Sequence, residues 1–224
     1  MGCSGSTERV LPEPPSGSEY DTFLGLLKES TDAGNPHGWK VKQNWVQKDG
    51  FKMKIALRPH SGNPNMLLRA DGKFKGVEPK DFADFLLAVE SLPGFKESRD
   101  VETLPDGCIK YLKVRAPGFG ARDHCWRYTF DRRDDGSIFA CIRSVEHAAC
   151  PPAPEAIRAY YYNASLFKMS AEEQGVMEMT EFVFQDLKGS LPPCLMNAAL
   201  PAGTLQANAM EMKHLKMKRS SSAD

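Results

Sequence analysis

The stretch from Leu187 to Lys218, which reads LKGSLPPCLMNAALPAGTLQANAMEMKHLKMK, decides the fold of this 224-residue chain. Between Gly189 and Met210 it contains no charged residue, and a helix of that length could span a bilayer. Its prolines and polar amides argue against a span, because a helix in hydrocarbon has to satisfy its own backbone hydrogen bonds. The stretch instead predicts a C-terminal helix that begins near Pro192-Pro193 and is covered by the protein itself.

The bulk composition excludes several kinds of partner and cofactor. Lys plus Arg and Asp plus Glu number 29 each, so no net field draws the chain to nucleic acid. The six cysteines form no C-x-x-C pair, which removes common zinc-site spacings, and no phosphate-cradling glycine motif occurs. We expect a monomeric single domain with no nucleic-acid partner, no metal and no other cofactor.

The residue pairs that could support nucleophilic catalysis are poorly placed. His124 and Cys125 are adjacent in a predicted strand, so they point to opposite faces of it. His147 and Cys150 come closer to a usable pair, but they lead into Pro151-Pro152, which is typical of a loop. We therefore expect no enzymatic activity.

The first residues match the pattern of N-myristoylation. Gly2 is the acceptor after removal of Met1, and Cys3 occupies a position where a palmitate commonly follows. One acyl chain binds a bilayer only marginally, so a second chain would give stable anchoring. We expect residues 1–17 to form a disordered acylated tether, residues 18–219 a folded domain and residues 220–224 a disordered tail. Since no secretory signal is present, the expected location is cytoplasmic and peripherally membrane-anchored.

Hydrophobic spacing predicts two helices before the C-terminal one. The first covers Ser18 to Ser30 and has Ser18 as its cap. The second opens at Glu78-Pro79 and stops at Pro93-Gly94. One face of this second helix carries Phe82, Phe85, Leu86, Val89 and Leu92.

Alternating residues and turn signals predict strands in the rest of the domain. Three strands precede the second helix, with a hairpin at Asp49-Gly50 and a third strand that continues in extended form across Asp71-Gly72. About six strands follow it: Val101–Leu104, Cys108–Arg115, Arg122–Arg132, Ser137–His147, Arg158–Met169 and Val176–Gln185. This order predicts an α+β fold with one curved antiparallel sheet of about nine strands, closed by the C-terminal helix and able to enclose a cavity.

Several motifs in this order resemble the START lipid-transfer domains. They are Arg122-Asp123 at a strand start, Ile157-Arg158-Ala159, the run Asp186 to Pro192, and Leu195-Met196-Asn197. The resemblance covers about Trp39 to Lys218 and extends to members that transfer phosphatidylcholine. It implies a helix-grip fold, in which the sheet wraps a long C-terminal helix and one lipid occupies the tunnel between them.

Strand alternation selects candidate residues for the wall of such a tunnel. Arg122, His124, Trp126, Tyr128 and Phe130 share one face, and this aromatic set with polar ends suits a lipid head group and its chains. The resemblance favours this face inward, and the alternative is an ordinary core strand.

Other candidates for the wall are less constrained by alternation. Arg143 could bind a phosphate or a carboxylate from inside, or it could equally face solvent. Either Tyr161 or its two tyrosine neighbours face the tunnel. On the C-terminal helix we expect the tunnel face to carry Leu195, Met196, Ala199 and Leu200 and a kink or hinge to lie at Pro201 and Gly203.

The loop Pro117-Gly118-Phe119-Gly120 is a candidate gate. Its two glycines permit movement and Phe119 offers an apolar tip. In START proteins the equivalent loop flanks the tunnel mouth, so the resemblance implies a gate that touches the bilayer. The alternative is a plain tight turn.

The resemblance implies that the chain extracts one lipid from a membrane without covalent chemistry. Its partners would be that lipid and the membrane surface, reached through the acyl chains and the tunnel mouth. Arg122, His124 and Arg143 offer more phosphate-binding capacity than a lone hydroxyl needs, so a phospholipid is favoured. A membrane-anchored lipid sensor or interaction module without transport, or a sterol carrier, stays open as an alternative.

Overall fold

The computed structural model describes residues 18–48, 51–60, 62–88, 94–116, 120–189 and 191–221. Its helices are α1 (Glu19–Thr31), α2 (Pro79–Leu87) and α3 (Pro193–Ser221). The strands are β1 (Lys40–Lys48), β2 (Phe51–His60), β3 (Asn63–Lys75), β4 (Phe95–Leu104), β5 (Gly107–Ala116), β6 (Gly120–Arg132), β7 (Ile138–Ser144), β8 (Ile157–Arg158), β9 (Tyr160–Met169) and β10 (Val176–Asp186).

Some of the sequence-based expectations fall outside the described residues. These are the tether over 1–17 with its acylation candidates Gly2 and Cys3, the hairpin turn at Asp49-Gly50, and the gate residues Pro117, Gly118 and Phe119. Val89 and Leu92, which we expected on the second helix, also lie outside them. Gly120 is described, as the exposed first residue of β6 with a φ of 66°.

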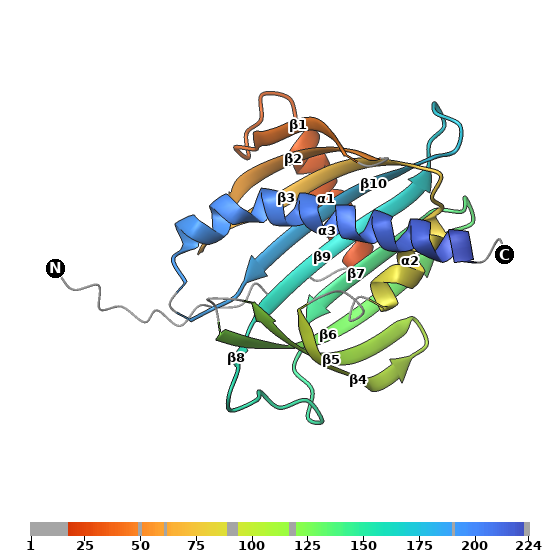
Figure 1. Cartoon of the computed structure of the whole chain (residues 1–224). Helices are drawn as coiled ribbons and strands as arrows, with labels where there is room; N and C mark the ends of the chain where they lie inside the picture. The colour runs from red at the N-terminus through yellow and green to blue at the C-terminus, as the bar shows by residue number, and fades with distance from the viewer. Residues whose placement is uncertain are drawn as a thin grey trace.

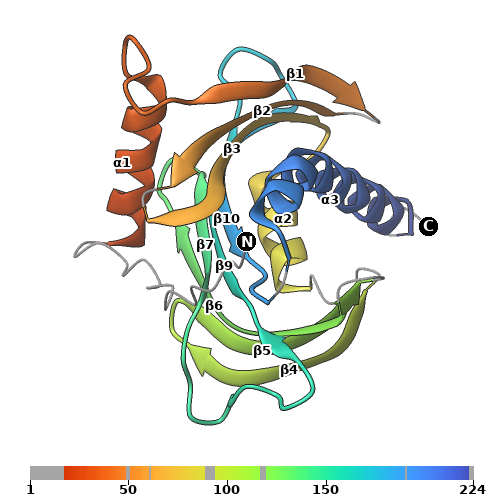
Figure 2. The ribbon, with the colours of Figure 1, turned by 90° about the vertical axis from the view of Figure 1, so that its left-hand side faces the viewer.

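The strands form one curved sheet in the order β1-β2-β3-β10-β9-β7-β6-β5-β4. All of these neighbours pair antiparallel, and the short β8 pairs parallel with β6. Figure 2 shows the sheet bent into an arc, with α2 and α3 inside the arc and α1 outside it. The expected α+β fold, with the C-terminal helix held by a curved sheet, is confirmed.

Helix α1 covers the convex face of the sheet. It begins with a capping box, in which Ser18 Oγ accepts a hydrogen bond from the Asp21 amide at 3.1 Å and the Asp21 carboxylate accepts one from the Ser18 amide. Phe23 is fully buried, and its ring lies 5.5 Å from those of both Phe139 and Phe182. The convex face therefore has an aromatic core of its own.

Helices α2 and α3 pack on the concave face. The Phe82 ring of α2 lies 4.9 Å from Phe74 of β3 and 5.4 Å from Phe167 of β9. Met212 and Leu215, near the end of α3, are buried in the same cluster. This cluster fixes α2 and the C-terminal half of α3 against the sheet.

The first turns of α3 are attached to the sheet by Asn197. Its Oδ1 accepts from the Met66 amide at 2.9 Å and its Nδ2 donates to the Pro64 carbonyl at 3.0 Å. The helix continues through Pro201 to Ser221, two residues beyond the expected domain end. None of the helices within the described residues is long and apolar enough to cross a membrane.

Strand β3 runs unbroken through Asp71-Gly72, as expected, because β2 and β10 pair with it on both sides. A Cβ on Gly72 would lie 2.5 Å from the Phe74 ring, so glycine is needed there for space. The strand expected over Ser137–His147 ends at Ser144, and the one expected over Arg158–Met169 is divided into β8 and β9.

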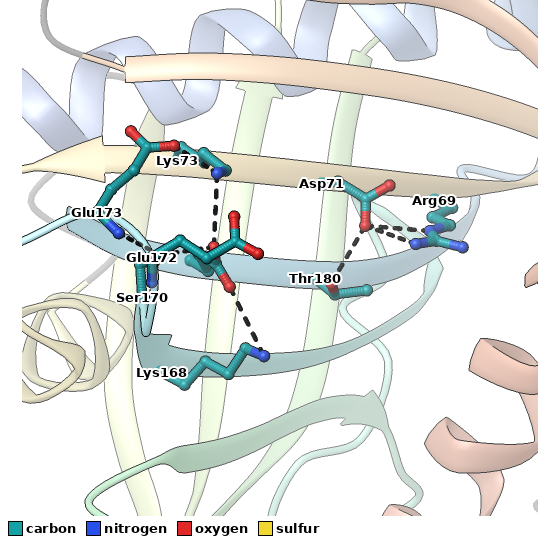
Figure 3. A network of polar contacts seen from close by, with 9 residues as sticks. Arg69, Asp71, Lys73, Lys168, Ser170, Glu172, Glu173 and Thr180 are labelled. Carbon is teal, nitrogen blue, oxygen red and sulfur yellow. Dashed lines mark hydrogen bonds and ion pairs between the residues drawn. The ribbon is translucent and has the colours of Figure 1, made fainter.

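The outer face of β3, β9 and β10 carries a network of ion pairs (Figure 3). Lys73 Nζ lies 2.6 Å from Glu173 and 3.6 Å from Glu178, which also lies 3.6 Å from Lys168. Glu178 and Thr180 of β10 belong to this outer face. Alternation along the strand then places Met179 and Glu181 on the concave face.

Candidate functional site

A cavity of about 490 Å³ lies between the concave face of the sheet and α3. A volume of this order is typical of small-molecule sites. Apolar side chains from α2 and from the sheet form most of the wall, among them Phe82, Leu86, Phe95, Ile142, Phe167 and Val183. One side of α3 closes it, from Met196 to Glu211.

Five of the sequence-predicted site residues line this cavity. They are Trp126 on β6, Tyr161 on β9, and Met196, Ala199 and Leu200 on α3. The rings of Trp126 and Tyr161 lie 4.8 Å apart, so two neighbouring regions of the sheet meet at this wall. Tyr128 is fully buried beside Trp126 in an apolar cluster with Leu112 and Ile142.

Arg122 lies at the junction between the sheet and α3, where it binds backbone oxygens. Its Nε donates to the Leu187 carbonyl at 2.8 Å and its Nη2 to the Lys188 carbonyl at 3.3 Å. The side chain is buried, and it fixes the turn in which Lys188 and Gly189 have φ values of 50° and 74°. Its contacts are those of an anchor for the start of α3.

His124 is buried against Trp126, with ring centroids 4.7 Å apart. Burial lowers its pKa to about 4, so the imidazole is neutral at physiological pH. Its Nδ1 has no hydrogen-bond partner among the described residues. A neutral ring of this kind offers no positive charge to a phosphate.

Arg143 lies on the convex side of the sheet. Its Nε donates to the Glu19 carboxylate of α1 at 2.7 Å. Tyr160 and Tyr162 pack on the same side, beside the α1 cluster, and this leaves Tyr161 as the inward-facing tyrosine. The ion pair with α1 explains the outward position of Arg143, which strand alternation alone left open.

Leu195 is 61% exposed and does not belong to the cavity wall formed by the described residues. It lies in the first turn of α3, before the helix reaches the sheet at Met196 and Asn197. Leu195 was expected at the tunnel wall, but its side chain lies on the exposed surface of α3.

Sequence reasoning missed a cluster of polar residues in the cavity wall. It contains Asn163 and Ser165 of β9, Glu181 of β10, and Asn208 and Glu211 of α3. Asn163 Nδ2 donates to Glu181 Oε2 at 3.1 Å, and Ser165 Oγ donates to Asn163 Oδ1 at 2.6 Å. The available signal was the position of Glu181, which lies on the same face of the strand as the buried Met177, Met179 and Val183.

Both carboxyl groups of this cluster are difficult to ionise. Loss of water raises the pKa of Glu181 to about 7, although the amides of Asn163 and Asn208 act in the opposite direction. Burial, and then the charge of Glu181, raises the pKa of Glu211 to about 8. Tyr161 shares this environment, and burial followed by the charge of Glu181 raises its pKa as well.

A second, larger hollow of about 910 Å³ lies at the β7–β8 connection. It is bordered by Arg143, His147, Cys150 and Lys188 together with the exposed Pro151 and Pro152. Loop residues contribute much of its border, so it lacks the continuous apolar wall of the cavity under α3. We take the smaller cavity as the candidate site.

Side chains of both residue pairs considered for catalysis have other partners or a raised pKa. His147 lies 3.1 Å from Glu102 through Nε2 and accepts the Ala149 amide through Nδ1. Burial, followed by contact with Cys150, raises the pKa of the Cys125 thiol to about 12. Within the described residues no group of His, Cys, Asp and Glu could hold a metal ion.

No protein-family model matches the chain. In sequence it is 24% identical over 189 residues to StAR-related lipid transfer protein 5 of Mus musculus, across 79% of this chain and 84% of that protein. The structure of human StAR-related lipid transfer protein 5 aligns with a TM-score of 0.72 and 19% identity, over 89% of this chain and 95% of that one. Human STARD10 aligns with a TM-score of 0.71 and 16% identity, over 91% and 83% of the two chains.

Proposed function

The chain has the helix-grip fold of START domains and its relatives are StAR-related lipid transfer proteins, and on this premise we propose that it binds one lipid non-covalently and transfers it between membranes. The observation that carries the proposal is the largely apolar cavity of about 490 Å³ under α3. Each methylene moved from water to apolar surroundings gains about 0.8 kcal/mol, which traps a free lipid in its bilayer. A cavity of similar polarity lowers the barrier to desorption.

The test is lipid transfer between donor and acceptor vesicles that carry fluorescent lipids. We expect the wild-type chain to accelerate transfer and Leu200→Asp to abolish it, because Leu200 lines the cavity and packs on the concave core. Gly203→Leu is a second variant that should also impair loading. A Cβ at Gly203 meets no atom within 4 Å, so the added side chain fills cavity space while the helix keeps its position.

Leu195→Asp is the matched control on the same helix. The Leu195 side chain is exposed and outside the cavity wall, so this variant should transfer lipid at the wild-type rate. The proposal fails if the wild-type chain accelerates transfer of no lipid class. It also fails if Leu200→Asp and Gly203→Leu both transfer normally.

N-terminal acylation is a separate part of the proposal. The motif at Gly2 and Cys3 favours a chain that stays on one membrane and exchanges lipid across a narrow gap, or that senses lipid without transporting it. The intact mass of protein purified from eukaryotic cells would contain one or two acyl additions, lost in Gly2→Ala. Lipid loading without vesicle transfer would support the sensor.

The class of lipid is the finer question. The expectation of a phospholipid ligand depended on Arg122, His124 and Arg143. None of these three is among the described residues that line the cavity. A phosphate-binding role for these three side chains therefore has no support from their contacts. The polar residues that do line the cavity provide a different basis for the choice.

A further inference from the structure

The described residues that line the cavity under α3 include no Arg, Lys or His, but they include Glu181 and Glu211. Glu181 lies on β10, in the sheet, and Glu211 lies on α3, the helix that covers the cavity. Figure 1 shows α3 crossing the sheet over β9 and β10, which agrees with this placement. The polar part of the wall is thus acidic and spans the joint between helix and sheet.

The hydrogen bonds within the cluster leave acceptors without donors. Glu181 is 6% exposed and Asn208 4%, and neither Glu181 Oε1 nor Asn208 Oδ1 has a partner among the described residues. Asn163 Nδ2 donates to Glu181 Oε2, and one N–H of Asn208 Nδ2 donates to the Thr204 carbonyl at 3.0 Å. A buried acceptor that lacks a donor is destabilising, so the site is complementary to a group that brings one.

We infer that Glu181, Asn208 and Glu211 form the polar recognition site of the cavity, and that it takes a lipid whose polar end carries no negative charge and donates hydrogen bonds from a hydroxyl or an amine. This inference rests on the proposed function and names the ligand class of the same cavity. It differs from the phosphate-binding expectation in both the residues and the sign of charge.

The groups that face Glu181 explain why an anion fits poorly. Tyr161 and Asn163 face it from β9, and Asn208 and Glu211 from α3, whereas α2 contributes Phe82 and Leu86. His214 lies one turn beyond Glu211 and packs on Phe85, with ring centroids 5.3 Å apart. No cation lines the described part of the cavity, so a phosphate or carboxylate would meet two acidic groups within a largely apolar wall.

The raised pKa values of the two carboxyls agree with this geometry. With pKa values of about 7 and about 8, Glu181 and Glu211 are partly protonated near neutral pH in the empty cavity. An ammonium group would stabilise their ionised forms and lower both pKa values. A hydroxyl would donate to the unpartnered acceptors without requiring ionisation.

The test is a series of ligands with the same dodecyl chain: dodecanol, dodecylamine, dodecanoate, dodecyl phosphate and dodecylphosphocholine. Dissociation constants are measured for the full chain at pH 7.5, below the micelle concentration, by displacement of a fluorescent apolar probe. We expect the alcohol and the amine to bind at least about tenfold more tightly than the two anions, since a charge-assisted hydrogen bond is worth about that factor. Comparison of dodecanol with dodecylamine then shows whether the site prefers a hydroxyl or an amine as the hydrogen-bond donor.

Glu181→Gln and Glu211→Gln test the residues directly. Each should reduce the preference for the amine over dodecyl phosphate to about threefold or less, because it removes one acidic group while preserving side-chain size. Glu178→Gln is the matched control on the same strand, since Glu178 belongs to the outer face with Ser170 and Lys73. It should leave the preference unchanged.

Two results would overturn the inference. One is equal or tighter binding of dodecyl phosphate, dodecanoate or dodecylphosphocholine than of the alcohol and amine. The other is an unchanged preference in both Glu181→Gln and Glu211→Gln. In either case the cavity still binds dodecyl chains and the proposed function stands, whereas a wild-type chain that binds none of the five ligands would refute the proposed function itself.

Discussion

Asp123 and Arg122 are neighbours on β6, and their side chains stabilise two different segments. Arg122 holds the carbonyls of Leu187 and Lys188 ahead of α3. Asp123 is fully buried, and its Oδ2 accepts from Arg158 Nη2 and from the Ala153 amide, each at 2.9 Å. The motif that indicated the family in the sequence is thus a pair of structural anchors on opposite faces of one strand.

Removal of the Asp123 carboxylate should destabilise the protein. In Asp123→Ala the Arg158 guanidinium loses its partner, and because its side chain is 21% exposed it recovers part of its hydration. We expect a loss of about 2–4 kcal/mol in the free energy of unfolding, measured by urea denaturation. Asp131→Ala is the control, since its pair with Arg133 is exposed and should change stability by less than about 1 kcal/mol. Equal effects of the two variants would contradict this assignment.

At the scale of elements, α3 is held differently at its two ends. Its C-terminal half packs Met212 and Leu215 into the concave core. Its first turns depend on Asn197, which bonds the backbone of β3 at Met66 and Pro64. The first turns of α3 are therefore attached to the sheet mainly through polar contacts, whereas Leu200, Leu205 and Ala209 further along pack on the concave core, so the start of the helix is the more suitable end for opening.

Asn197→Ala should loosen the start of α3. It removes two hydrogen bonds and leaves the Met66 amide without its partner, which costs about 1–2 kcal/mol. We expect faster hydrogen exchange over the first turns of α3 and faster release of bound lipid, with little change near Met212 and Leu215. Leu195→Ala, an exposed change two residues away, is the control. A uniform increase in exchange along α3 would show that the helix opens as one unit.

Most of the elements could be predicted from sequence because their signals are local. The cap at Ser18, the hydrophobic spacing of α2 and the strand alternation that put Trp126 and Tyr128 on one face all depend on residues close together in the chain. The resemblance to START domains was needed to favour that face as the inward one. The orientation of Arg143 depends on Glu19, which is 124 residues away. The burial of Glu181 depends likewise on how α3 packs over β10, so sequence alternation could identify its face and not its environment.

At the scale of the whole molecule, the curved sheet separates two cores. The convex core around Phe23 and Phe182 lies under α1, and the concave core around Phe74 and Phe82 lies under α2 and α3. Because the cavity belongs to the concave side, α3 can move without exposing the convex core. In the proposed lipid exchange, the sheet and α1 would therefore be the stable part of the molecule.

The cavity acids should make the stability of the empty protein depend on pH. The pKa values of Glu181 and Glu211 are raised to about 7 and about 8 from an ordinary value of 4.5, so above pH 4.5 the folded protein holds protons that the unfolded chain releases. The free energy of unfolding must therefore fall as pH rises from 4.5 through about 8, by on the order of 1 kcal/mol per pH unit for each carboxyl. His124 has the opposite effect on the free energy of unfolding. Because its pKa is lowered to about 4 in the folded protein, the unfolded chain binds a proton below pH 6.5 that the folded protein does not, so stability rises with pH between about 4 and 6.5.

The double variant Glu181→Gln, Glu211→Gln isolates this effect. We expect its free energy of unfolding, measured by urea denaturation between pH 5 and 8.5, to exceed that of the wild type by a margin that grows with pH, because the glutamines do not ionise. Glu178→Gln should show no such trend in this range, since the hydrogen bond from Ser170, with the charges of Lys168 and Lys73, lowers the pKa of Glu178 against the effect of burial. A constant difference between the double variant and wild type would mean that both carboxyls titrate normally and remain hydrated.

Addition of dodecylamine should reduce the pH dependence of the free energy of unfolding of the wild type, because the bound ammonium favours the ionised carboxylates that destabilise the empty cavity.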